Sequence, residues 1–172
     1  MDLAAKLRVI PDFPQPGISF KDITTLLKDA GAFKEAMDRL AGACRELDFD
    51  LVVAPEARGF IIGSALAYAL GKGFVPVRKA GKLPGDSLVG EYQLEYGQDR
   101  LEIHLDAVRP GQRVLVVDDL LATGGTISAT LDLVKRLGGE VAGVAFLIEL
   151  AYLPGRQNLG EYHVITVIRL ES

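Results

Sequence analysis

Hydrophobic residues fall into short continuous runs that alternate with stretches of helical periodicity. The runs lack strict alternation with polar residues, which is typical of parallel strands covered on both faces. This order predicts an α/β fold with a central, mostly parallel sheet flanked by helices. The runs expected to form the central strands are Leu51 to Ala54, Gly73 to Val77, Val114 to Val117, Val141 to Ile148 and His163 to Ile168.

Helical periodicity predicts three helices, at Phe33 to Leu47, Gly59 to Leu70 and Thr126 to Leu137. In the first of them, apolar residues recur at spacings of three or four, and Cys44 lies on this stripe. We therefore expect Cys44 to be a buried core thiol and not a nucleophile.

Two segments break the alternation and are expected to lie over the core. Ile10 to Phe20 contains three prolines and a glycine, too many for a helix or a central strand. Glu91 to Leu105 indicates two extended arms around a turn near Gly97, Gln98 and Asp99. Such coverings often form pockets or lids. We expect one domain over residues 1–172, with a small N-terminal hood at 1–32 and a basic loop and flexible hairpin lid at 78–105.

Composition narrows the class of protein. The 172 residues are 49% hydrophobic and 24% charged, which suits a globular chain able to bury a core. The net charge of −4 provides no global positive field for nucleic acid. A single cysteine favours a reducing compartment. The chain shows neither a signal-peptide pattern nor an apolar run long enough to span a bilayer, so we expect a cytoplasmic protein without a membrane partner.

The most informative motif follows the strand Val114 to Val117. Asp118 and Asp119 come at the carboxyl end of this strand, where ligands of open parallel sheets bind. A loop then leads into a helix, and its glycines, hydroxyls and helix N-terminus suit a phosphate monoester. Two carboxylates would repel that phosphate unless sugar hydroxyls or Mg²⁺ lie between them. The loop comprises Ala122, Thr123, Gly124, Gly125 and Thr126.

The alternative to a phosphate site is a strand that ends in acidic residues and is followed by a Gly-rich turn, in another flavodoxin-like fold such as a receiver domain. Triphosphate and dinucleotide binding are disfavoured, because the chain has no G-x-x-x-x-G-K-[ST] and no G-x-G-x-x-G after a strand.

A second anion site is predicted at two neighbouring strand ends. Arg58 lies at the turn after the strand Leu51 to Ala54 and suits a forked contact with an anion. Its alternative is a surface arginine paired with Glu56. Arg78, Lys79 and Lys82 follow the strand that ends at Val77, on the same side of the sheet as the phosphate loop.

The run VLVVDDLLATGGT from Val114 to Thr126 resembles the phosphoribosyl-pyrophosphate (PRPP) motif of the type I phosphoribosyltransferases. The resemblance implies that Asp118 and Asp119 hold the ribose hydroxyls and that the loop from Ala122 to Thr126 holds the 5′-phosphate. It also implies a Mg²⁺ ion that is bound mainly through the substrate, with no direct protein ligand.

Two further runs, VAPEARGF and RKAGKLPG, resemble segments around pyrophosphate in the adenine phosphoribosyltransferases. A serine is common in that family where this chain has Ala57, so a hydroxyl contact there must be lost or replaced, while a backbone contact would survive. The pyrophosphate-binding residues implied are Glu56, Ala57, Arg58, Arg78, Lys79 and Lys82.

The N-terminal run from Asp12 to Ile23 resembles the hood of the same family. This resemblance implies backbone contacts to the base from Ser19 and Lys21, with Phe20 and Leu120 on the two faces of the purine ring. Phe20 suits an ordinary core position equally well.

The run LEYG resembles the family's lid. It implies that Glu95 acts as a catalytic group at the imidazole edge of the purine, together with Arg58, and that Tyr96 helps to close the lid. The alternative for Glu95 is a solvated surface acid. Residues after about Tyr152 add little to the resemblance.

The activity implied is that of a glycosyltransferase of the pentosyltransferase class, which converts adenine and PRPP to AMP and pyrophosphate in purine salvage. A homodimer is expected from the family alone. Alternatives are a transferase for hypoxanthine, guanine, xanthine or orotate, or a PRPP-sensing regulator. The regulator is disfavoured by the acidic chain and the lack of length for a DNA-binding module. His104 and His163 are expected to be structural or exposed.

Overall fold

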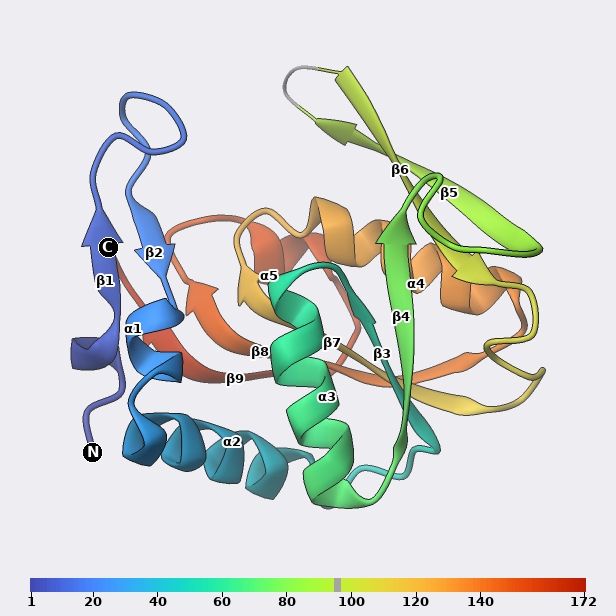
Figure 1. Ribbon diagram of the computed structural model, residues 1–172, viewed down its shortest axis with the longest axis horizontal. Helices are drawn as coiled ribbons and strands as arrows, with labels where there is room; N and C mark the ends of the chain where they lie inside the picture. The colour runs from blue at the N-terminus through green and yellow to red at the C-terminus, as the bar shows by residue number, and fades with distance from the viewer. Residues whose placement is uncertain (95–96) are drawn as a thin grey trace.

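The computed structural model describes the backbone of residues 1–94 and 97–172, with side chains described outside 93–97. Its centre is a seven-stranded sheet in the order β5-β6-β4-β3-β7-β8-β9 (Figure 1). The five strands from β4 to β9 in this order are parallel, and the β5–β6 hairpin adds antiparallel to β4. The strands are β3 (Leu51–Pro55), β4 (Gly73–Lys79), β5 (Ser87–Leu94), β6 (Gly97–His104), β7 (Arg113–Leu121), β8 (Glu140–Leu150) and β9 (Val164–Leu170).

Two hydrophobic cores cover the two faces of this sheet, which explains why its strands read as continuous apolar runs. In β7, Leu115 and Val117 pack in one core, while Val114 and Val116 pack in the other. All four side chains are fully buried. Because successive residues of a strand point to opposite faces, a strand between two cores needs an apolar residue at every position. The predicted α/β fold and its five central strands are confirmed.

The helices lie in layers on either side of the sheet (Figure 1). Helices α2 (Ala30–Cys44) and α3 (Arg58–Leu70) cover one face, and α4 (Gly125–Arg136) covers the other. The predicted helices are confirmed, although α2 begins three residues earlier than expected. It begins there because the Asp29 side chain accepts a hydrogen bond from the Ala32 backbone N–H and caps the helix. Cys44 is buried as predicted, and this burial raises the pKa of its thiol to about 11.

The N-terminal segment forms a small unit of its own at the side of the sheet (Figure 1). Its two short strands pair antiparallel, and Asp22 at the end of the second is buried. The backbone N–H of Thr24 and the Arg8 side chain donate to Asp22 and lower its pKa to about 2. This ion pair fastens the segment, whose elements are η1 (Ala4–Lys6), β1 (Arg8–Ile10), β2 (Phe20–Asp22) and α1 (Thr24–Leu27).

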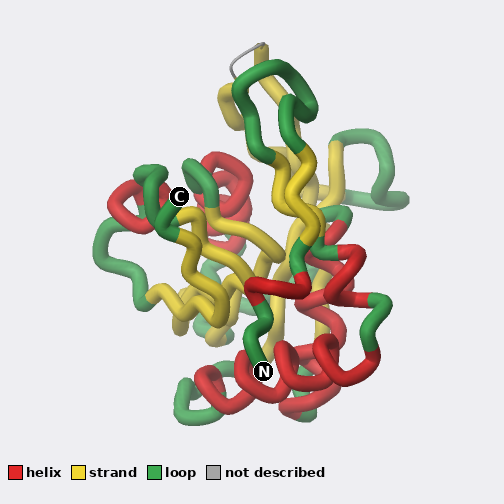
Figure 2. Tube along the Cα trace, turned by 90° about the vertical axis from the view of Figure 1, so that its left-hand side faces the viewer, coloured by secondary structure: helices red, strands yellow, loops and turns green. Residues whose placement is uncertain are grey.

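The β5–β6 hairpin projects from the edge of the sheet (Figures 1 and 2). Its strands pair continuously from Ser87↔His104 to Leu94↔Gly97. The turn predicted near Gly97, Gln98 and Asp99 is therefore wrong, because these three residues belong to β6 and pair with Leu94, Gln93 and Tyr92 of β5. Helix α4 supports the hairpin from below, where Arg136 Nη1 donates to the Val89 carbonyl at 2.9 Å.

After β8, a short helix α5 (Gly155–Asn158) precedes β9. The sequence analysis did not predict this helix. In the described part of the chain, none of the helices has the length and hydropathy that crossing a bilayer requires.

Candidate active site

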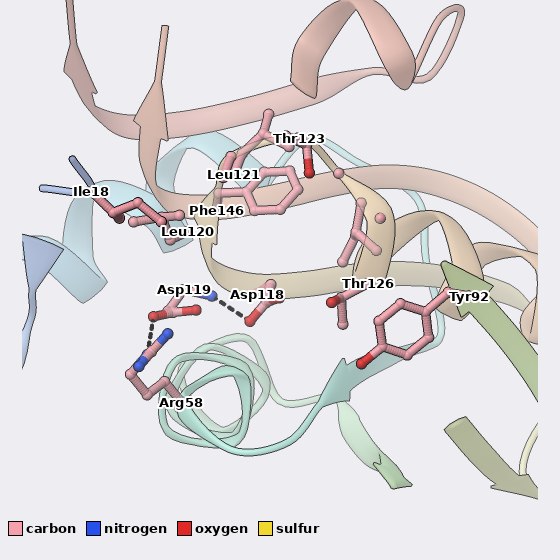
Figure 3. A pocket seen from close by; sticks show the side chains of 14 residues that line it. Ile18, Arg58, Tyr92, Asp118, Asp119, Leu120, Leu121, Thr123, Thr126 and Phe146 are labelled. Carbon is pink, nitrogen blue, oxygen red and sulfur yellow. Dashed lines mark hydrogen bonds and ion pairs between the residues drawn. The ribbon is translucent and has the colours of Figure 1, made fainter. Parts of the chain in front are cut away.

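A cavity of about 480 Å³ opens beside the end of β7 (Figure 3). Five parts of the chain enclose it, namely the N-terminal segment, the start of α3, the hairpin strand β5, strand β8 and the run from the end of β7 into α4. The predicted ribose and 5′-phosphate residues all lie in this lining. The lining residues are Ile18, Arg58, Tyr92, Phe146 and the continuous run from Asp118 to Ile127.

The two acids at the end of β7 have different surroundings. The Asp119 backbone N–H donates to Asp118 Oδ1 at 2.8 Å, and Asp119 itself is 5% exposed. Arg58 Nε donates to Asp119 Oδ2 at 2.6 Å (Figure 3). Gly59, in the first turn of α3, lies so close to Asp118 that a Cβ there would come within 2.8 Å of Oδ1. The start of α3 therefore fixes both acids, one by an ion pair and the other by close packing.

Burial raises the pKa of Asp118 well above its ordinary value of 3.8, and the neighbouring Asp119 carboxylate raises it further. The Arg58 guanidinium acts in the opposite direction on the pKa of Asp118. The cleft thus holds a carboxyl that accepts a proton more readily than a solvated aspartate. Such a pair suits neutral hydroxyl ligands better than it suits an anion.

The loop from Ala122 to Thr126 joins β7 to α4 with a left-handed residue at the junction. Gly124 has a φ of 89° and is the N-cap of α4. A residue with a side chain is strained at this angle, so glycine is required. The N-terminus of a twelve-residue helix then faces the cavity with unpaired backbone N–H groups. This arrangement suits an anion of the size of a phosphate.

The segment predicted to bind pyrophosphate is organised around Glu56. The Lys79 backbone N–H donates to the Glu56 carboxylate at 2.7 Å, Lys82 Nζ at 3.2 Å and Arg78 Nε at 3.3 Å. Burial alone would raise the pKa of Glu56, but these donors outweigh burial and lower the pKa. The Glu56–Ala57 peptide bond is cis, and the Ala57 side chain is exposed.

Of the six residues predicted at the pyrophosphate site, all of which the structure describes, only Arg58 lines the cavity. Arg58 does not pair with Glu56, since its partner is Asp119. The Lys79 ammonium lies 3.8 Å from Asp99 of the hairpin. Arg78 and Lys82 meet at Glu56, beside the cavity. The structure thus brings two cations of the basic loop, Arg78 and Lys82, to one carboxylate, while the Lys79 side chain pairs with Asp99.

The residues predicted to contact the base divide into two groups. Leu120 lines the cavity, and Ile18 of the N-terminal segment, which the sequence analysis did not single out, lines it too (Figure 3). Phe20 is half-buried outside this lining, with the Arg58 guanidinium 5.3 Å from its ring centre. Ser19 is exposed, and its hydroxyl lies 3.2 Å from Lys21 Nζ. Arg58 therefore connects the N-terminal segment to the acids of β7.

Tyr92 is the lining residue that the hairpin contributes, and the sequence analysis did not identify it. Its hydroxyl donates to Asp99 Oδ2 across the hairpin at 3.1 Å. Burial raises the pKa of Tyr92, and the negative charge of Asp99 adds to this effect. The strict pairing of β5 with β6 puts Tyr92 opposite Asp99, a register that the misplaced turn concealed.

Glu95 and Tyr96, predicted as a catalytic group and a lid residue, lie outside the described residues. His104 is half-buried, with Nε2 at 2.9 Å from the Pro84 carbonyl, and His163 is exposed. The two histidines occupy the structural and exposed positions expected for them.

The comparison with known families agrees with this geometry. A family model described as a phosphoribosyl transferase domain matches residues 24–170, from α1 to the end of β9. The match takes in both acids, the phosphate loop and the basic loop. The chain belongs to the phosphoribosyltransferase family.

Full-length relatives narrow the position within that family. The chain is 62% identical to the adenine phosphoribosyltransferase of Thermotoga petrophila, covering 98% of this chain and 99% of the relative. It is 56% identical to that of Desulforamulus reducens over the full length of both. The crystal structure of the enzyme from Thermoanaerobacter pseudethanolicus superposes with a TM-score of 0.96 at 57% identity, covering 98% of each chain. Among the phosphoribosyltransferases, the chain groups with the adenine-specific branch.

A more distant solved structure shares the fold and carries ligands. The adenine phosphoribosyltransferase of Saccharomyces cerevisiae matches with a TM-score of 0.89 at 41% identity, covering 96% of each chain. That protein was crystallised with adenine and an imino-altritol bisphosphate.

Proposed function

We propose that this chain transfers the 5-phosphoribosyl group of PRPP to adenine, giving AMP and pyrophosphate in purine salvage. The observation that carries the proposal is the pairing of Asp118 and Asp119 with the Gly-rich loop at the end of β7, inside a cavity of about 480 Å³. Relatives of 56–62% identity that match the chain over its whole length bear the name of this activity.

The donor side of the cleft would hold the ribose and its 5′-phosphate. Asp118 and Asp119 would accept hydrogen bonds from the ribose hydroxyls, for which the raised pKa of Asp118 is favourable. The backbone N–H groups of Ala122, Thr123, Gly124, Gly125 and Thr126 would hold the 5′-phosphate at the helix N-terminus. The sugar would then lie with C1′ toward Arg58.

The cations proposed for the pyrophosphate side form ion pairs with carboxylates of the protein. Arg58 is bound to Asp119, while Arg78 and Lys82 are bound to Glu56. We propose that pyrophosphate draws these side chains and Lys79 toward itself, with backbone groups of Glu56 and Ala57 completing the site. The phosphate oxygens would replace carboxylate oxygens as partners, which keeps the cations paired throughout.

The acceptor side would hold adenine under the N-terminal segment. Leu120 and Ile18 line this part of the cavity, and Phe20 lies beside Arg58, 5.3 Å from its guanidinium. We propose that Phe20 and Leu120 hold the two faces of the purine and that backbone groups of Ser19 and Lys21 read its edge. Glu95 would assist at the imidazole edge, and Tyr96 would help to close the cleft.

In this reaction the base nitrogen forms a bond to C1′ as the bond from C1′ to the pyrophosphate oxygen breaks, with inversion at C1′. The proton that this nitrogen carried in adenine would pass to the pyrophosphate product. Positive charge develops on the ribose and negative charge on the leaving pyrophosphate. No covalent nucleophile is required. Catalysis would come from alignment of the two substrates, cationic stabilisation of the leaving group by Arg58 and the basic loop, and exclusion of water.

Mg²⁺ is proposed as the metal, bound mainly through oxygens of PRPP. The residues that the structure describes contain no group of three or more His, Cys, Asp or Glu side chains placed to hold a metal ion. Asp118 offers a carboxylate to the ribose side, whereas Asp119 is engaged by Arg58. When bound, the ion would neutralise charge on the leaving pyrophosphate.

A cytoplasmic homodimer is proposed for the assembled enzyme, with no nucleic acid or membrane partner. The support for a dimer is the exposure of two large apolar side chains, two helical turns apart on the outer side of α3, where Tyr68 is 91% exposed and Ile61 is 40% exposed. Large apolar groups that stand in water at this level often belong to protein–protein contacts.

The experiment that tests the proposal measures pyrophosphate release from PRPP with adenine, guanine, hypoxanthine, xanthine or orotate as acceptor. We expect adenine-dependent release, abolished in the double variant Asp118→Asn with Asp119→Asn and by chelation of Mg²⁺. Circular dichroism should show that the double variant is folded. Release with another base instead of adenine would establish the alternative transferase, and DNA binding without release would establish the regulator.

A further inference from the structure

The short helix α5 packs directly against the loop from Ala122 to Thr126. Asn158 Nδ2 donates to the Thr123 carbonyl oxygen at 2.8 Å. At Gly155, an added Cβ would lie 2.3 Å from the Ala122 carbonyl oxygen and 2.7 Å from Leu121 Cδ1. The backbone of α5 therefore touches the loop with no room for a side chain between them.

A buried ion pair fixes α5 in this position. Glu149, near the end of β8, is 2% exposed and accepts hydrogen bonds from Arg156 Nε at 2.9 Å and Nη2 at 2.8 Å. Thr166 Oγ1 and Arg169 Nη1, both on β9, donate to the same carboxylate at 3.1 Å. Arg156 lies inside α5, so the helix is tied to the two strands at the edge of the sheet. A two-pronged arginine contact of this kind sets orientation as well as distance.

The direction of the carbonyl groups explains what α5 does for the loop. In a trans peptide, the C=O of one residue and the N–H of the next point in opposite directions. Holding the Thr123 carbonyl on α5 aims the Gly124 N–H away from α5. The close approach of Gly155 restricts the Ala122 carbonyl in the same way and so aims the Thr123 N–H.

The cavity lies on the side of the loop to which these N–H groups are aimed. All five loop residues line it, whereas α5, which is described in full, contributes no lining residue. An anion site built from backbone N–H groups requires that the matching carbonyls be held elsewhere, because a rotated peptide would turn an oxygen toward the phosphate.

We infer that Asn158 and Gly155 are positioning residues for the anion loop, which they hold from behind with its N–H groups directed at the 5′-phosphate of the substrate. This inference rests on the proposed assignment of that loop to the 5′-phosphate. Asn158 does not touch the substrate; it acts through the Thr123 carbonyl.

The test compares Asn158→Ala with Asn158→Asp, which keeps the size of the side chain but removes its donor. We expect either change to raise the KM for PRPP, and the Kd for ribose 5-phosphate, by about three- to tenfold. The KM for adenine and the kcat at saturating PRPP should remain within about twofold. Gln157→Ala, an exposed neighbour on the same helix, should change none of these values.

Three outcomes would overturn the inference. Asn158 variants that bind ribose 5-phosphate like the wild type, while Gly124→Val loses this binding, would remove the role of α5 and leave the phosphate assignment intact. Gly124→Val with unaltered ribose 5-phosphate binding would remove the phosphate assignment itself, and the inference with it. An equal fall in kcat and rise in both KM values for Asn158→Ala would indicate general loosening and also count against it.

Discussion

Arg58 is the side chain on which the separate parts of the cleft converge. From the first turn of α3 it donates to Asp119 at 2.6 Å, and its guanidinium lies 5.3 Å from the ring centre of Phe20. A guanidinium can do both because its edge donates hydrogen bonds while its face stacks on aromatic rings. Lysine could not reproduce this geometry, so Arg58 is expected to be sensitive even to conservative replacement.

The protonation of Asp118 predicts a stability change that depends on pH. A carboxyl whose pKa is raised by folding lowers the stability of the folded state once it ionises. This loss of stability is absent below the ordinary pKa of 3.8 and grows as the pH rises toward the pKa in the folded state. Asp118→Asn removes the ionisable group. We expect this variant to have a higher free energy of unfolding than the wild type at neutral pH, with the gain shrinking toward pH 3.8. Urea unfolding across this range measures it, and a gain independent of pH would contradict the assignment.

The contact between Gly59 and Asp118 predicts a loss of activity without a comparable loss of stability. A Cβ on Gly59 would come within 2.8 Å of Asp118 Oδ1, so Gly59→Ala should displace the carboxyl. Misplacement of about 1 Å can cost on the order of 10²-fold in rate, and we expect kcat/KM for PRPP to fall by at least tenfold. The matched control is Gly42→Ala in α2, where a Cβ meets nothing within 4 Å. That variant should gain about 0.5–1 kcal/mol of stability with unchanged activity, and equal activities of the two variants would contradict the prediction.

At the scale of elements, the sequence predicted what depends on continuous hydrophobic patterning. Strand β7 and the loop into α4 could be placed because Val114 to Val117 are apolar at every position and two acids and two glycines follow. The strands of the N-terminal segment could not be placed, because β1 and β2 are only three residues long and are separated by a proline-rich stretch.

The features that the sequence analysis missed are contacts between distant segments. Asn158, which it did not identify, reaches Thr123 across 35 positions of the chain, and the pairing of Arg58 with Asp119 spans 61 positions. Such pairings leave no local signal, because the two side chains are brought together by the fold and not by sequence spacing. Tyr92 was not identified because the turn of the hairpin was predicted at Gly97 to Asp99. A turn at that position cannot place Tyr92 opposite Asp99.

The hairpin strand β5 carries the prediction that belongs to this scale. The Tyr92 hydroxyl donates to Asp99 and also interacts with Thr126 of the phosphate loop, so Tyr92 links the hairpin to the donor side of the cleft. We expect Tyr92→Phe to raise the KM for PRPP by about two- to tenfold, the value of one hydrogen bond, with little change in kcat. Tyr152→Phe, at a tyrosine that is 45% exposed after β8, serves as control. Equal kinetics for the two variants would exclude the link.

The whole molecule has a sheet with a core on each face, and the most exposed large apolar side chain among the described residues lies on α3. Tyr68 projects from this helix with 91% of its surface in water. If the outer side of α3 forms the proposed dimer contact, Tyr68→Asp should shift the sedimentation coefficient to that of a monomer, because a charge would be buried without a partner. Tyr68→Phe should remain dimeric. A dimer unaffected by Tyr68→Asp would locate the contact elsewhere.

The ion pair between Arg58 and Asp119 also bears on the design of inhibitors. The cleft contains a positive group, Arg58, where a sugar analogue would approach the acid pair. An analogue with its own positive charge therefore competes with Arg58 for Asp119, and its affinity is the difference between two cation–carboxylate contacts. A cationic analogue that also offers a phosphate oxygen to the displaced Arg58 would leave both cations paired, its own with Asp119 and Arg58 with the phosphate. A ligand with a cationic ring and an attached phosphate should therefore bind this cleft more tightly than the ring alone. The gain in affinity should exceed the contribution of the contacts between the phosphate and the phosphate loop.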